Sequence, residues 1–217
     1  MPEYITNASE RQLCMLVLDA SQSMQTRDAG SGRARIELLN QGIETLYGEL
    51  RKDEKALVRV QIAAIRVGGA TDEAREILDW TDGVDFRPFS LRAGQGTPLG
   101  AGVLLALKTI EAQKAVLRSN GISLAGRPWL FVMTDGEPTD TNATWQEACE
   151  TAQQHEAGKK VSIYSIGIGE ANLGKLSQLN IQRSPQLIQA VDFTKLFIFV
   201  STSISAGGIR DDVWADV

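Results

Sequence analysis

The sequence predicts a single α/β domain with a doubly wound, mostly parallel central sheet, one antiparallel edge strand, and helices on both faces. Two observations carry this prediction. Short, continuously apolar runs are typical of strands covered on both faces, and here they alternate with longer segments whose apolar residues keep helical spacing. The apolar runs near 12–19 and 129–133 each stop at an aspartate, as strands do at the ligand-binding edge of such a sheet.

The first half of the chain alternates apolar runs with one long helix. Residues 12–19 are apolar almost throughout and predict a buried strand. Over 34–52 the apolar residues recur at three- and four-residue intervals, which predicts a helix with one buried face. Residues 55–67 alternate apolar and polar before both faces become apolar, so we expect a second strand there. After a glycine-rich turn, 76–80 is predicted to be the antiparallel edge strand.

The second half repeats the pattern. Pro98 is well placed as the first residue of a helix that reaches about residue 117, because proline is tolerated in the first turn. Runs at 129–133 and 161–168 predict two buried strands, separated by a helix whose buried stripe runs from Trp145 to Ala152. A short helix over 173–179, an edge strand over 186–190 and a last helix from Asp192 follow. We therefore assign 1–206 to one domain and 207–217 to a flexible, acidic tail.

Charge and composition argue against several classes of function. The formal net charge is −5, and the basic residues are scattered, whereas a nucleic-acid surface gathers them. No apolar run approaches the roughly 20 residues of a membrane span, and the N-terminus lacks the basic start and apolar core of a signal peptide. We expect a cytoplasmic protein that binds neither nucleic acid nor membrane, with Cys14 and Cys149 as buried free thiols.

Three oxygen-bearing side chains follow the first strand at alternate positions: Asp19, Ser21 and Ser23. Side chains alternate with a period of two in extended chain, so these three can point to one side of the loop that leaves the strand. Carboxylate and hydroxyl oxygens suit Mg²⁺ or Mn²⁺, whereas zinc and copper prefer imidazole and thiolate. The pattern predicts a site for a hard cation at this strand end.

Two further residues are expected at the same edge. Thr97 lies in a glycine-rich segment, and taken alone it reads as the N-cap of the helix that Pro98 begins. Asp135 follows the apolar run 129–133 and precedes a glycine, which taken alone is ordinary turn chemistry. In a doubly wound sheet, however, Asp19 and Asp135 fall at one carboxyl edge with the Thr97 loop beside them.

Together these features resemble the von Willebrand factor A family, whose Asp-x-Ser-x-Ser signature, threonine loop and later aspartate build a metal-ion-dependent adhesion site. The resemblance implies five ligands here: Asp19, Ser21, Ser23, Thr97 and Asp135. It also implies that the hydroxyls bind Mg²⁺ or Mn²⁺ directly, that the aspartates often act through water, and that an acidic residue of a partner protein completes the coordination. Gln22 stands where the family usually has glycine, and the long polar segment 25–33, expected to be mobile, is the larger departure.

Within this family the chain is similar to bacterial cytosolic TerY-type proteins of tellurite-resistance clusters. The segments that carry this resemblance are 93–100, 133–140 and 200–205. Such proteins are often encoded with a Ser/Thr kinase and a PP2C-like phosphatase. The resemblance therefore implies an adaptor without catalytic activity, working in a stress-response or phospho-signalling complex with partners of that kind.

Two other functions stay open at this point. A Mg²⁺-dependent phosphohydrolase could use Asp19 as its nucleophile, but such enzymes usually have a second aspartate two residues on as general acid, and here that residue is Ser21. A structural scaffold with an idle metal site is the other alternative. Glu137 and Asp140 lie near the site in sequence, either as outer acids of the metal site or, more simply, as solvated loop charges.

Overall fold

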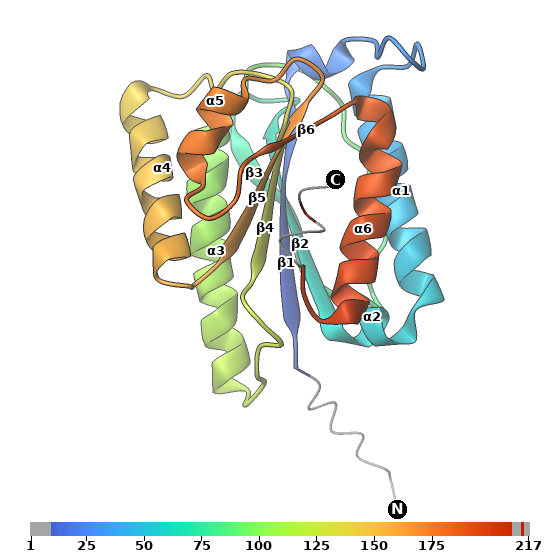
Figure 1. The fold of residues 1–217 in the computed structure, drawn as a ribbon, viewed down its shortest axis with the longest axis vertical. Helices are drawn as coiled ribbons and strands as arrows, with labels where there is room; N and C mark the ends of the chain where they lie inside the picture. The colour runs from blue at the N-terminus through green and yellow to red at the C-terminus, as the bar shows by residue number, and fades with distance from the viewer. Residues whose placement is uncertain (1–9, 210–213, 215–217) are drawn as a thin grey trace, which may run out of the picture.

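A six-stranded sheet separates two layers of helices (Figure 1). The computed structural model describes residues 10–209 and Trp214. The strands, in the order in which they lie side by side, are β3 (Ala74–Asp82), β2 (Val60–Gly68), β1 (Gln12–Ala20), β4 (Trp129–Thr134), β5 (Ser162–Ile168) and β6 (Gln186–Ile188). All neighbouring strands are parallel except β2 and β3, which pair antiparallel. The predicted fold class is confirmed, with β3 as the antiparallel edge.

The order of the strands reverses next to β1. The chain moves from β1 to β2 on one side and later returns to place β4 on the other side, which makes the gap between the ends of β1 and β4 the switch point of the sheet. In open α/β sheets this is where ligands bind. Every residue of β1 and β4 is buried, because helices cover both faces of these central strands.

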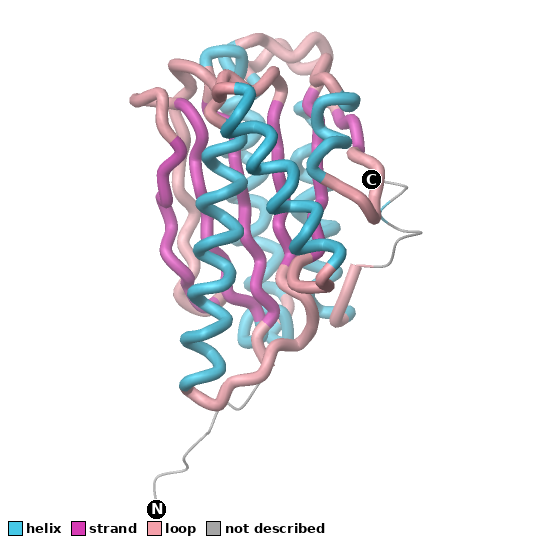
Figure 2. Tube along the Cα trace, turned by 90° about the vertical axis from the view of Figure 1, so that its left-hand side faces the viewer, coloured by secondary structure: helices cyan, strands magenta, loops and turns pink. Residues whose placement is uncertain are grey.

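Alternate residues of β1 belong to different layers of the core. Leu16 and Leu18 pack with residues of α1 and α6, whereas Met15 and Val17 pack with residues of α3 and α4. Figure 2 shows the sheet from the side of the α3 and α4 layer. The α-helices of the described residues are α1 (Arg35–Lys52), α2 (Glu54–Arg59), α3 (Leu99–Ser119), α4 (Asn142–Ala157), α5 (Leu173–Leu176) and α6 (Phe193–Ala206). Among the described residues, no helix has the length and apolar content that a membrane span needs.

The predicted second strand is wrong over its first residues. The segment 54–59 is helix α2, and β2 begins only at Val60. The carboxylate of Asp53 accepts hydrogen bonds from the backbone N–H groups of Lys55 and Ala56, at 2.9 and 3.1 Å, and so caps this helix. The alternating pattern favoured a strand, but a capping aspartate followed by good helix formers decides the local structure.

The polar segment 25–33 forms a hydrogen-bonded loop. A short 3₁₀ turn (Gln22–Gln25) leaves the end of β1, and the carboxylate of Asp28 then accepts hydrogen bonds from the N–H groups of Gly30 and Ser31. The N–H of Arg35 donates to the carbonyl of Thr26 at 3.0 Å. This loop therefore sets where α1 begins and where the side chain of Arg35 is placed.

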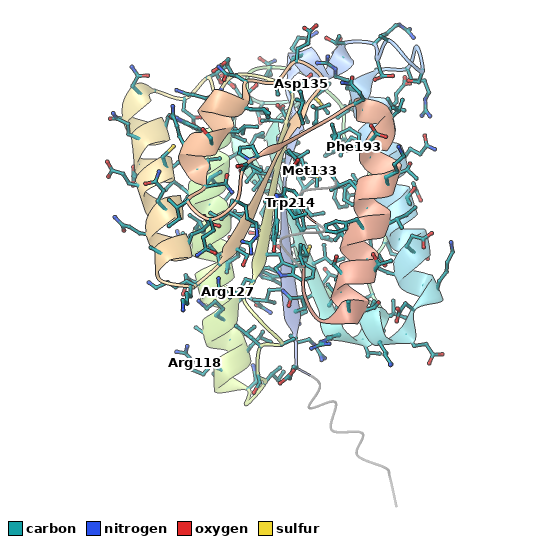
Figure 3. The ribbon with its side chains drawn as sticks, viewed as in Figure 1. Arg118, Arg127, Met133, Asp135, Phe193 and Trp214 are labelled. Atoms are coloured by element: carbon teal, nitrogen blue, oxygen red, sulfur yellow. The ribbon has the colours of Figure 1, made fainter. Side chains whose placement is uncertain are left out.

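Trp214 packs onto the sheet on the α6 side (Figure 3). Its side chain is buried, its ring lies edge-on to that of Tyr164 with centroids 4.9 Å apart, and its indole N–H donates to the carbonyl of Ser184. Trp214 belongs to the segment 207–217 predicted to be a flexible tail, and this residue is anchored. Residues 210–213 and 215–217 lie outside the described residues, so the prediction stays a prediction there.

We predict that Trp214→Ala lowers the free energy of unfolding by about 3 kcal/mol, because it removes a buried aromatic side chain from the core. Urea unfolding followed by circular dichroism measures this value. Leu187→Ala on β6 is the matched control, since Leu187 is 47% exposed and its truncation should cost no more than about 0.5 kcal/mol. Equal effects of the two substitutions would show that Trp214 adds nothing to the core.

Candidate metal centre

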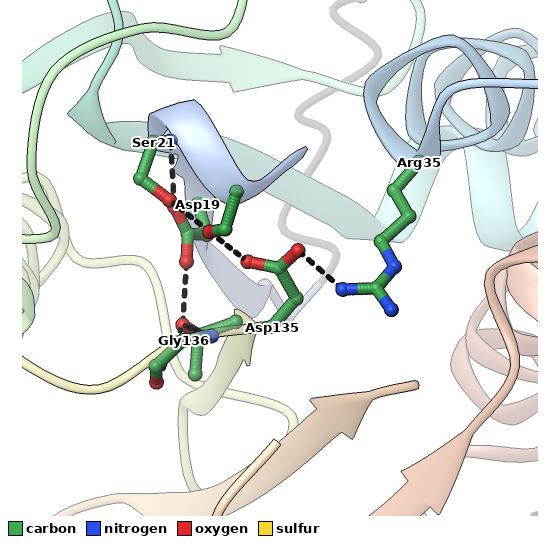
Figure 4. Close-up of polar contacts among 7 residues, drawn as sticks. Asp19, Ser21, Arg35, Asp135 and Gly136 are labelled. Carbon is green, nitrogen blue, oxygen red and sulfur yellow. Dashed lines mark hydrogen bonds and ion pairs between the residues drawn. The ribbon is translucent and has the colours of Figure 1, made fainter. Parts of the chain in front are cut away.

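The ends of β1 and β4 bring the two predicted aspartates together. Leu18 pairs with Met133 in the sheet, so Asp19 lies beside Thr134, and Asp135 follows directly after. Asp19 is fully buried and Asp135 nearly so. Figure 4 shows the two carboxylates at the same edge, with the Ser21–Ser23 loop on one side and Arg35 on the other.

A chain of hydrogen bonds joins four of the five predicted site residues. The backbone N–H of Ser21 donates to Asp19 Oδ1 at 2.7 Å. The hydroxyl oxygens of Ser21 and Ser23 lie 2.9 Å apart, and the Ser23 hydroxyl donates to Asp135 Oδ1 at 2.5 Å. The oxygens that the sequence predicts as ligands are therefore already gathered, with hydroxyl protons between them.

Thr97 is the fifth predicted residue, and its hydroxyl faces the same place. A Cβ added at Gly136 would lie 3.4 Å from Ser23 Oγ and 3.6 Å from Thr97 Oγ1, so both hydroxyls border the space beside this glycine. The loop that carries Thr97 is tied to the end of β1 by two backbone hydrogen bonds, from Gly94 N–H to Ala20 O and from Gln22 N–H to Gln95 O, both 2.9 Å long.

Gly68 allows the two loops to approach each other. It ends β2 with a φ of +73°, and a Cβ there would lie 2.3 Å from the carbonyl oxygen of Gly96 and 3.1 Å from the nitrogen of Ser21. A side chain at this position would push the Thr97 loop away from the Ser21–Ser23 loop. The site geometry therefore depends on a glycine that carries no ligand.

The predicted N-cap role of Thr97 is wrong. Pro98 occupies the N-cap position of α3, which begins at Leu99, and neither Pro98 nor Thr97 caps the helix with its side chain. The carboxylate of Asp140 does so, by accepting hydrogen bonds from the N–H groups of Gly100 and Ala101 at 2.7 and 3.0 Å. Asp140 is thus a helix cap supplied by a distant loop, which leaves the Thr97 hydroxyl at the site.

Two contacts of the aspartates are not evident from the sequence pattern. The buried hydroxyl of Thr134 donates to Asp19 Oδ2 at 2.5 Å. Arg35 Nη1 donates to Asp135 Oδ2 at 2.8 Å, and its side chain is only 14% exposed. The sequence feature that could have indicated a role for Thr134 is its position directly before Asp135. Arg35 carried no signal, because nothing along the chain distinguishes it from the other basic residues.

The electrostatics of the site favour a cation. Burial raises the pKa of Asp19 to about 6, although hydrogen bonds from Ser21 and Thr134 act in the opposite direction and lower it. The nearby carboxylate of Asp135 adds to the increase. A buried carboxylate with only neutral donors is costly to keep ionised. A divalent ion among these oxygens would remove that cost.

The donor set fits a hard cation that takes neutral ligands. Within residues 10–209 and Trp214, no group of three or more histidine, cysteine, aspartate or glutamate side chains is placed to hold a metal. A site here therefore depends on hydroxyls, and the gathered donors are two carboxylates and three hydroxyls. All of these donors are oxygen atoms, which are the ligands that Mg²⁺ and Mn²⁺ prefer. Glu137 is exposed and accepts a hydrogen bond from Asn172, so it belongs to the solvated surface of this loop.

Comparisons with known proteins agree with this architecture. Residues 14–201 match the family model for the von Willebrand factor type A domain. The comparison with curated protein sequences found no match. Among solved structures, the vWF domain of the type V pili tip protein Mfa5 from Porphyromonas gingivalis is similar, with a TM-score of 0.61 and 11% identity over 93% of this chain and 97% of that one.

Two further structures are similar. The SpRpn10 VWA domain has a TM-score of 0.56 and 11% identity over 86% of this chain and 95% of that one. Proximal thread matrix protein 1 from the mussel byssus has a TM-score of 0.56 and 14% identity over 91% of this chain, which spans about half (48%) of the mussel protein. At such identities the likeness concerns the fold.

We predict that Asp19→Asn stabilises the metal-free protein relative to wild type as the pH rises. The folded-state pKa of Asp19, about 6, lies above its ordinary value of 3.8, so the folded state binds this proton more tightly than the unfolded state. The resulting stabilisation is complete below about pH 4 and is lost as the pH rises through about 6. Between these limits the free energy of unfolding of wild type should fall by about 2–3 kcal/mol, whereas that of the asparagine variant should not.

Urea unfolding in the presence of a chelator, at several pH values from about 4 to 7, measures this difference. Glu137→Gln is the matched control, because this exposed carboxylate lies on the same loop as Asp135. A constant difference between wild type and Asp19→Asn across the pH range would contradict the prediction.

Proposed function

The chain belongs to the von Willebrand factor type A domain family, and we propose that it is a protein-binding adaptor that docks an acidic residue of a partner on a Mg²⁺ or Mn²⁺ ion. The observation that carries the proposal is the connected set of oxygens at the switch point of the sheet. Asp19, Ser21, Ser23 and Asp135 are joined by hydrogen bonds there, and the Thr97 hydroxyl borders the same space.

The ligand types support binding of an outside carboxylate. Ser21, Ser23 and Thr97 would hold the ion through neutral hydroxyls, while Asp19 and Asp135 would face it with their carboxylates. A divalent ion with neutral direct ligands keeps much of its positive charge and retains exchangeable positions, as Mg²⁺ usually does in proteins. An acidic side chain of a partner would supply the missing anionic ligand.

The surroundings of Asp19 support a role without turnover. The carboxylate is fully buried, and each of its oxygens accepts a hydrogen bond, one from the Ser21 N–H and one from the Thr134 hydroxyl. A phosphohydrolase nucleophile needs an accessible oxygen and a general acid nearby, and Ser21 stands where that acid would be. We therefore propose a binding module in place of the enzyme considered from the sequence.

The choice of partner comes from the resemblance to TerY-type proteins. We propose a cytoplasmic Ser/Thr kinase and a PP2C-like phosphatase as the first candidates, in a bacterial stress-response or phospho-signalling complex. Their acidic surface residues are the groups to test against the candidate metal centre.

We predict that Thr97→Ala weakens Mn²⁺ binding at least about tenfold, because it removes one of three neutral ligands. Calorimetric titration of the metal-free protein with Mn²⁺ measures the affinity. Thr202→Ala is the matched control, since Thr202 is exposed on α6, and it should bind Mn²⁺ like wild type. Equal affinities for wild type and Thr97→Ala would place the ion elsewhere.

A pull-down with each candidate partner tests the docking step. Wild type and Thr97→Ala are compared in Mg²⁺ and in chelator. We expect capture by wild type only in the presence of metal. Capture that is equal in all four conditions would contradict a metal-bridged contact and leave a scaffold acting through another surface.

A further inference from the structure

We propose that Arg35 couples ion binding to anion binding at this centre. It lowers the affinity of the site for the metal ion alone and raises the affinity of the metal-bound site for a carboxylate. The inference rests on the proposed function and concerns a residue outside the five predicted ligands. Its basis is the ion pair between Arg35 and Asp135, which lies one carboxylate away from the gathered hydroxyls.

The two oxygens of Asp135 have different partners. Oδ1 accepts from the Ser23 hydroxyl at 2.5 Å, on the side of the predicted ligands. Oδ2 accepts from Arg35 Nη1 at 2.8 Å, on the side of α1. Because the carboxylate of Asp135 bridges the hydroxyl cluster and the guanidinium, a divalent ion bound by the cluster would be separated from a second positive charge by this carboxylate.

The guanidinium is held in place by two parts of the fold. Arg35 is the first residue of α1, and its backbone is fixed by the hydrogen bond to Thr26 in the preceding loop. On its other side the guanidinium packs against Gly169, where a Cβ would lie only 2.5 Å from Arg35 Nη2. Gly169 has a φ of +64°, which also favours glycine. The charge is therefore positioned by packing as well as by Asp135.

The net charge of the centre changes sign when the ion binds. Asp19 and Asp135 together carry two negative charges when ionised, which a divalent ion would cancel. Arg35 adds one positive charge, so the loaded centre becomes net positive and attracts an anion, while the ion alone is repelled by the guanidinium. The Arg35 side chain is 14% exposed and that of Asp135 is fully buried, so solvent and salt screen this interaction only in part.

Because such coupling is reciprocal, a carboxylate that binds the loaded centre must also strengthen ion binding. An adaptor of this kind holds its ion firmly only when an acidic partner is docked. Arg35 thus sets how much a bound partner raises the affinity for the ion, and how much a bound ion raises the affinity for the partner.

The test is a calorimetric titration of metal-free protein with Mn²⁺, in sodium chloride and in sodium acetate of equal ionic strength. The variants are Arg35→Gln, which removes the charge, and Arg35→Lys, which keeps it. Arg33→Gln is the matched control, because Arg33 lies two residues away, is exposed, and pairs with Glu37 on the helix surface.

In chloride we expect Arg35→Gln to bind Mn²⁺ roughly three- to tenfold more tightly than wild type, as removal of a neighbouring charge predicts. Arg35→Lys and Arg33→Gln should stay close to wild type. Acetate should tighten Mn²⁺ binding in wild type more than in Arg35→Gln.

The outcomes separate the two proposals. If wild type binds Mn²⁺ but Arg35→Gln binds it equally or more weakly in chloride, the coupling role of Arg35 is overturned and the metal centre stands. The same holds if acetate tightens binding equally in wild type and Arg35→Gln. If wild type binds no Mn²⁺, both the proposed function and this inference fail.

Discussion

Two carboxylates buried side by side at the ends of neighbouring strands are the constraint on which this structure depends. Their burial follows from the sheet, since β1 and β4 are central and covered on both faces. Ionised carboxylates at such a place need compensation. Among the described residues the chain supplies it from three directions: a serine loop after β1, a threonine before Asp135, and Arg35 from α1.

The parts of the fold around the carboxylates are arranged so that these donors reach them. Gly68 and Gly136 leave room for the loops to meet, and Asp140 caps α3 from the loop after β4, so that the threonine before the helix is not needed as its cap. Asp140 also ties that loop to the start of α3, and the backbone hydrogen bond from Thr139 to Thr97 adds a second link. Helix capping and site assembly are thus the same set of contacts.

The sequence predicted what depends on local pattern. The central strands and the gathering of Asp19, Ser21, Ser23 and Asp135 follow from apolar runs that end in acids, because strand order and crossover handedness then fix where the ends meet. The antiparallel edge follows from the glycine-rich turn before it. Features that depend on contacts between distant segments were missed. The cap by Asp140, the ion pair of Arg35 and the anchoring of Trp214 each join residues far apart in the chain, and α2 was hidden by a pattern that also fits a strand.

The two carboxylates are compensated unequally, and this inequality bears on where a cation would bind at the proposed centre. Among the described residues, one oxygen of Asp135 is paired with the positively charged Arg35, whereas the donors to Asp19 are the neutral groups of Ser21 and Thr134. The uncompensated charge therefore lies on the β1 side, beneath the Ser21–Ser23 loop. At the proposed metal centre a divalent ion would be drawn toward that charge and repelled by Arg35, so both effects would favour the side bordered by the hydroxyls. The charge distribution thus supports the same side of the proposed centre as the predicted ligand pattern.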